Sequence, residues 1–92
     1  MSYRVILRPQ LAENLQVVFF LGHEHGRDVE PLREALGEIM RRLATDPGDE
    51  GESRDDNERV LIVGPLSVVF EVIEVQRIVL IHTAILYPGQ RL

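Results

Sequence analysis

The sequence predicts an α+β fold, in which a two-helix hairpin packs on a twisted antiparallel sheet of about four strands in the order β-α-α-β-β-β. Three stretches carry this prediction. Residues 3–7 alternate like a strand, residues 9–44 have helical spacing with a glycine-marked interruption, and residues 58–86 are rich in Val, Ile and Leu. Valine and isoleucine are stiff at χ1 and pack well on a pleated surface, so the last stretch favours strands.

The N-terminal strand and the first helix are predicted from a change of period. Residues 3–7 place Tyr, Val and Leu on one face, which is the period of a strand. Pro9 suits the first turn of a helix, where the N–H that it lacks would have no partner. The following apolar residues recur at helical spacing: Leu11, Leu15, Val18 and Phe19. We expect the helix to end where Gly22 and Gly26 mark a break.

The second helix has the clearest pattern of the chain. Asp28 is its expected N-cap, because a carboxylate accepts hydrogen bonds from the free N–H groups of the first turn. Its apolar face comprises Val29, Leu32, Leu36, Ile39, Met40 and Leu43. We expect the helix to end near Ala44, because Asp46 precedes Pro47 and a residue before proline avoids the α region.

An acidic loop is predicted over residues 45–57, which include no apolar side chain. Seven of the 15 acids lie between positions 46 and 58, where Arg54 is the only base. Such a segment is expected to be solvated and mobile. We expect it to meet either a basic partner or the protein's own arginines, with Arg4 and Arg8 or Arg41 and Arg42 as the surfaces that it reaches.

Residues 58–86 predict a three-stranded antiparallel meander. Gly64-Pro65 forms the first turn, and residues 74–76 form the second. Both faces of these strands are apolar, whereas a helical hairpin covers only one. The second face therefore predicts a partner protein, a dimer or a strongly curled sheet.

Length and composition restrict the function classes. The 92 residues predict a single domain, 1–92, and the absence of cysteine excludes disulfides and thiolate chemistry. All 10 bases are arginine, so lysine Schiff-base chemistry is excluded too. The net charge of −5 and the lack of a basic stripe argue against nonspecific nucleic-acid binding. Neither a signal peptide nor a membrane segment is expected, which predicts a cytoplasmic protein.

Four segments, taken in order, resemble the RelE/ParE superfamily of toxins from toxin–antitoxin and plasmid-stabilisation modules. They are YRVILRP at 3–9, the helical hairpin ending in LATDP at 43–47, ERVLIVGPLSVVFEV at 58–72 and RIVLIHTAIL at 77–86. The resemblance covers nearly the whole chain and implies two helices packed on a twisted sheet, with the first strand joining the meander.

The resemblance also implies a function. The mRNA-cleaving branch of this family uses basic and aromatic side chains on the sheet and near the C-terminus. Here Ser67 and Ile85-Leu86-Tyr87 stand at those positions, and only Arg59 and Tyr87 match the family's functional types. We therefore expect a protein that acts by binding: it is captured by a cognate antitoxin and has a gyrase-type target. The expected partner-binding residues are Arg4, Arg8, Arg41, Arg42 and Arg59.

Two alternatives remain open at this point. One is a ribosome-associated RNA endonuclease, in which Arg59 stabilises phosphate charge while His82 or Tyr87 handles the proton. It requires these three residues to converge on one solvent-facing patch. The other is a structural homodimer that keeps only the fold.

A metal site and a cofactor are not expected. His23 and His25, with His82, are the only candidate imidazole ligands, and they lack an acid at a recognisable ligand spacing. A solvated loop accounts for the first two, and a core or cross-strand position accounts for His82.

Overall fold

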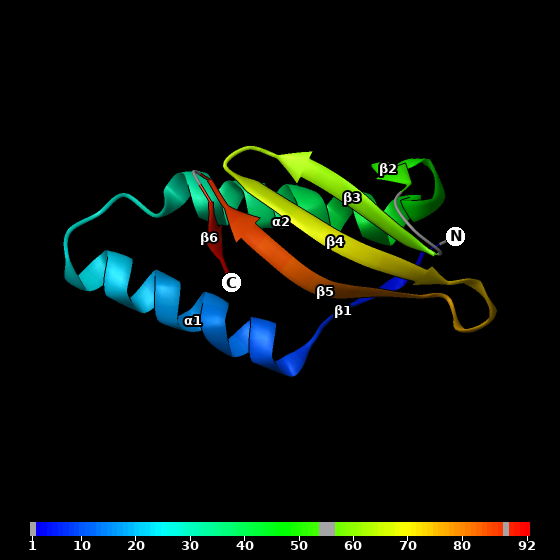
Figure 1. The fold of residues 1–92 in the computed structure, drawn as a ribbon, viewed down its shortest axis with the longest axis horizontal. Helices are drawn as coiled ribbons and strands as arrows, with labels where there is room; N and C mark the ends of the chain where they lie inside the picture. The colour runs from blue at the N-terminus through cyan, green and yellow to red at the C-terminus, as the bar shows by residue number, and fades with distance from the viewer. Residues whose placement is uncertain (1, 54–56, 88) are drawn as a thin grey trace.

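A computed structural model describes residues 2–53, 57–87 and 89–92. Its elements, in chain order, are β1 (Arg4–Leu7), α1 (Pro9–Glu24), α2 (Glu30–Thr45), η1 (Pro47–Asp49), β2 (Glu52–Ser53), β3 (Glu58–Val63), β4 (Leu66–Ile73), η2 (Glu74–Gln76), β5 (Ile78–Leu86) and β6 (Gln90–Arg91). The α+β class and the order β-α-α-β-β-β are confirmed (Figure 1). The two-residue strands β2 and β6 were not predicted.

The sheet has the strand order β1-β5-β4-β3-β2, and β6 pairs with the end of β5. Strands β3, β4 and β5 form the predicted antiparallel meander. Strand β1 joins it beside β5 but runs parallel to it, so the expectation of a purely antiparallel sheet is corrected. Parallel neighbours need a long connection, which both helices and the meander supply here.

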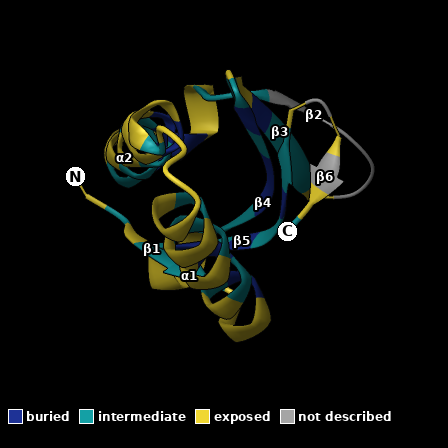
Figure 2. Ribbon diagram, turned by 90° about the vertical axis from the view of Figure 1, so that its left-hand side faces the viewer, coloured by how far each residue is buried: buried dark blue, intermediate teal, exposed yellow. Residues whose placement is uncertain are grey.

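Both α-helices lie on the same side of the curved sheet, and the described residues place no α-helix on its other side (Figure 2). We call the first side the covered face. Its core includes side chains from both helices and from alternate strand positions: Leu11, Leu15, Leu32, Ala35, Ile39, Leu43, Leu61, Leu66, Val68, Phe70, Val79, Ile81 and Ala84. Because successive strand residues point to opposite faces, the intervening residues form what we call the outer sheet face.

Helix α1 is longer than predicted. It passes through Gly22 and ends at Glu24, so His23 lies in the last helical turn and His25 caps it. A Cβ added at Gly22 would stand 2.6 Å from Cγ1 of Val29, which is closer than real carbon atoms approach. The glycine is therefore explained by close contact across the helical hairpin rather than by the break that was predicted there.

Helix α2 begins at Glu30, and Val29 occupies the cap position. The predicted cap, Asp28, lies one residue earlier, but its Oδ1 still accepts a 3.0 Å hydrogen bond from the Glu30 N–H. The helix ends at Thr45, which agrees with the predicted stop before Pro47.

The acidic segment is only partly a solvated loop. Pro47 is fully buried, η1 follows α2 directly, and β2 pairs with β3. Gly51 has φ +71°, and a Cβ there would stand 2.3 Å from the Val60 carbonyl oxygen, so the close approach of β2 to β3 requires glycine. Arg54, Asp55 and Asp56 lie outside the described residues.

Within the described part of the chain, neither helix combines the length and the apolar character that crossing a bilayer requires.

Candidate functional site

The outer sheet face is an apolar surface that neither helix covers. Its apolar side chains come from four strands: Ile6, Val60, Ile62, Val69, Ile73, Ile78, Leu80 and Ile85. Most are half-buried by their neighbours, and Ile62 is 72 % exposed. Its charged side chains include Arg4 and Arg8 on the β1 side, Glu58 on the β3 side and Glu71 on the middle strand β4.

Within this face, His82 is held between two charged side chains. It sits at a bulge, because Val69 pairs with Thr83 while Phe70 pairs with Ile81, which leaves His82 unpaired. Its Nε2 lies 3.0 Å from Oε1 of Glu71 on β4, and its Nδ1 lies 2.7 Å from Nη2 of Arg8 at the end of β1. We call Arg8, His82 and Glu71 the outer-face trio.

The trio has a defined hydrogen-bonding pattern. A guanidinium has only donors, so Arg8 donates to Nδ1, and Nε2–H of His82 donates to the Glu71 carboxylate. Both ring nitrogens of His82 are therefore occupied. A general base needs a ring nitrogen within reach of the proton that it removes, and this arrangement offers none.

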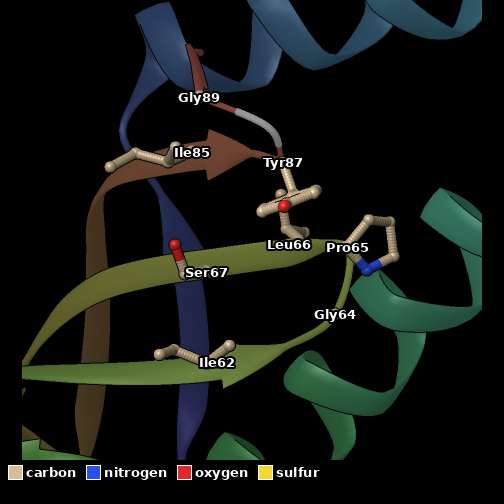
Figure 3. A pocket seen from close by; sticks show the side chains of 8 residues that line it. All are labelled: Ile62, Gly64, Pro65, Leu66, Ser67, Ile85, Tyr87 and Gly89. Atoms are coloured by element: carbon tan, nitrogen blue, oxygen red, sulfur yellow. The ribbon is translucent and has the colours of Figure 1, made fainter.

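A second apolar surface surrounds Tyr87, whose ring is 76 % exposed at the end of β5. One side of Tyr87 borders a hollow of about 340 Å³, shown in Figure 3. A row of side chains from three adjacent strands lies along it, namely Ile62, Ser67 and Ile85. Its lining also includes Pro65 and Leu66 from the β3–β4 turn.

Tyr87 also lines a second hollow, of about 410 Å³, between the β3–β4 turn and the helical hairpin. Its walls include Leu21 of α1 and Pro31 of α2, and Pro65 is shared with the first hollow. Leu21 is 47 % exposed. We call the two hollows with Tyr87 between them the Tyr87 end.

Arg59 donates hydrogen bonds to the backbone within the fold. It lies on the covered face opposite Phe70, at the edge where β2 joins the sheet. Its Nε donates to the Glu50 carbonyl at 2.9 Å, and its Nη2 donates to the Gly51 carbonyl at 3.3 Å. Arg59 therefore contacts the acidic segment through its backbone oxygens.

Arg41 and Arg42, which were predicted to bind a partner, form ion pairs within the protein. Arg41 pairs with Glu38 at 2.6 Å, and this hydrogen bond lowers the pKa of the Glu38 carboxyl. Arg42 pairs with Glu50 at 2.5 Å, which raises the pKa of the guanidinium and fixes the acidic segment against α2. Arg4 is exposed on the outer sheet face, and no ion pair of Arg4 occurs within the described ranges.

The structure does not bring the three predicted catalytic residues together. Arg59 lies on the covered face, His82 lies on the outer sheet face, and Tyr87 stands at the far end of β5. The endonuclease hypothesis required these three residues on one patch. Instead, His82 is joined by Arg8 and Glu71, and Tyr87 is joined by Leu21 and Ile62.

Glu71, Leu21 and Ile62 were not among the predicted site residues. Strand alternation was the available signal for Ile62, since it places an isoleucine opposite the core-facing Leu61. Pairing of β4 with β5 brings Glu71 next to His82, and no local sequence pattern predicts this contact.

Among the residues that the structure describes, no three His, Asp or Glu side chains gather closely enough to hold a metal ion. Comparison with protein families, with curated proteins and with solved structures finds no match for this chain.

Proposed function

We propose that this protein is a binding module of the RelE/ParE toxin type, which acts by protein binding and is held by a cognate antitoxin. The observation that carries the proposal is the Tyr87 end, where two hollows of about 340 and 410 Å³ flank an exposed aromatic ring. A polypeptide segment that crosses Tyr87 would place apolar side chains in the first hollow and would meet Arg27 and Asp28 as well as apolar side chains in the second. Aromatic anchors of this kind contribute much of the affinity in protein interfaces.

Three further observations support the proposal. The strand and helix order agrees with the fold that the sequence resemblance implies. The only histidine on the sheet has both ring nitrogens engaged, by Arg8 and by Glu71. The first hollow is also almost wholly apolar in its lining, which suits a hydrophobic side chain better than a phosphate group.

Induced expression in a bacterial culture tests this function, with growth, DNA synthesis and RNA integrity followed together. We expect growth arrest by the unchanged protein, with DNA synthesis failing before mRNA is broken. Tyr87→Asp places a charge between the two hollows and should abolish arrest. Val75→Asp is the matched control, because Val75 is 96 % exposed on η2 and lines neither hollow.

A third variant separates binding from cleavage. His82→Gln should still arrest growth if the protein acts by binding. Early mRNA breakage that His82→Gln prevents would overturn the proposal in favour of the endonuclease. Normal growth with abundant folded protein would reject a toxin of either kind.

A further inference from the structure

The outer sheet face carries a second inference, which does not depend on the toxin proposal. Leu80 and Val69 lie on its two middle strands beside the paired His82 and Glu71, and neither helix covers it. An apolar sheet face of this extent packs stably against another sheet, about 10 Å away. The charged residues of this face indicate which protein supplies the second sheet.

These charges are arranged asymmetrically. Pairing across the sheet aligns Ile6, Leu80, Glu71 and Glu58 in one row, from β1 to β3. On β1, Arg4 and Arg8 share the outer face with Ile6 and stand on either side of this row. The β1 side therefore carries two arginines, and the β3 side carries Glu58. No ion pair of Arg4 or of Glu58 occurs among the residues that the structure describes.

We infer that the outer sheet face binds a second copy of this chain, about a two-fold axis parallel to the strands. Such an axis lays the β1 margin of one copy over the β3 margin of the other and keeps each residue at its level along the strands. Arg4 and Arg8 of one copy then flank Glu58 of the other, and the contact occurs twice. A two-fold axis perpendicular to the strands would instead oppose β1 to β1 and bring arginines together.

The size of the face sets the strength of this dimer. Four strands about 4.8 Å apart and about seven residues of 3.3 Å each give a face of roughly 450 Å² in projection. Two copies then bury about 900 Å², which is in the range of weak, transient interfaces. A dissociation constant in the micromolar range is expected, with a marked dependence on salt because the ion pairs lie at the solvated margins.

Sedimentation velocity over about 5 to 500 μM protein measures this constant, a range that brackets micromolar dissociation. Arg4→Glu should weaken the dimer by about tenfold or more, because it opposes Glu58 with a like charge at two equivalent places. Glu58→Arg should do the same. The double variant Arg4→Glu/Glu58→Arg restores opposite charges and should return the dissociation constant to near its original value.

Two controls keep this test decisive. Arg33→Glu makes the same charge change on the exposed surface of α2 and should leave association unchanged. Leu80→Asp should abolish the dimer, and circular dichroism will show that each variant keeps its fold. A protein that stays monomeric at the highest concentration overturns the inference. So does a dimer that Arg4→Glu does not weaken, or one that the charge swap fails to restore.

The result of this experiment is independent of the result of the growth test. The Tyr87 end and the outer sheet face share Ile62 and Ile85, but Tyr87 itself follows the last residue of β5. Tyr87→Asp should therefore leave the dimer intact. Loss of toxicity with dimerisation unchanged would show that toxicity requires Tyr87 and that self-association does not.

Discussion

The two faces of this sheet contain the same kinds of residue but differ in how far the fold buries them. On the covered face, Phe70, Val79 and Ile81 have no exposed surface. On the outer sheet face, Leu80 is half-buried and Ile62 is 72 % exposed. Apolar character therefore predicts that a position lies in a strand but not that the fold buries it. What separates the faces is the helical hairpin, which covers only one of them.

The largest expected effect on stability comes from removing a buried side chain from the covered face. Phe70→Ala removes a fully buried ring and should lower the free energy of unfolding by about 3–5 kcal/mol. Ile62→Ala on the outer sheet face should change it by no more than about 0.5 kcal/mol. Urea denaturation measures both values. Equal losses from the two substitutions would show that the outer sheet face is also buried in solution.

A smaller effect is expected at Arg59, where the covered face reaches the edge of the sheet. Arg59→Met keeps most of the aliphatic stem but leaves the Glu50 and Gly51 carbonyls without these donors. We expect a loss of about 1–2 kcal/mol, the usual cost of removing a partner from a part-buried hydrogen bond. Arg41→Met is the control, because its pair with Glu38 lies on the exposed side of α2. An equal loss in the two variants would contradict the structural position given to Arg59.

The smallest effect concerns pH, at the exposed turn that follows α2. A side-chain hydrogen bond with Asp49 and the negative charge there raise the pKa of Asp46. A raised pKa means that the folded protein binds this proton more tightly than the unfolded chain. Stability from this pair is therefore present at low pH and is lost as the pH rises through the folded pKa.

Asp49→Asn removes the carboxylate that disfavours ionised Asp46. It should raise the denaturation midpoint slightly near pH 7, and the gain should shrink as Asp46 becomes protonated toward about pH 3. Thermal melts of both proteins across this range provide the measurement. A gain that is the same at every pH would show that the effect does not come from Asp46.

Most of the covered face could be predicted from the sequence, because periodic burial leaves a periodic pattern. The spacing of Leu32, Ile39 and Leu43 marked the buried side of α2. Alternation over residues 3–7 predicted β1 but not its direction, since a strand shows the same alternation in either orientation. Gly22 was interpreted as a break, because a glycine that permits close contact looks the same in sequence as one that ends a helix.

Less of the candidate site could be predicted. His82 and Tyr87 were identified by residue type, but their neighbours come from distant segments. Arg8 and Glu71 meet His82 only after β1 and β4 have taken their places on either side of β5. The hollows beside Tyr87 likewise need the β3–β4 turn and the helical hairpin to be in place.

The parallel pairing of β1 with β5 affects how the chain can fold while it is being synthesised. Arg4 pairs with Ile78 and Leu7 pairs with Ile81, so β1 is synthesised about 70 residues before its partner β5. Val5 and Leu7 therefore stay unpaired until β5 has left the ribosome. Contacts so distant in sequence slow folding and expose nascent chains to aggregation. A nascent-chain chaperone that shields the N-terminal strand should therefore raise the yield of folded protein.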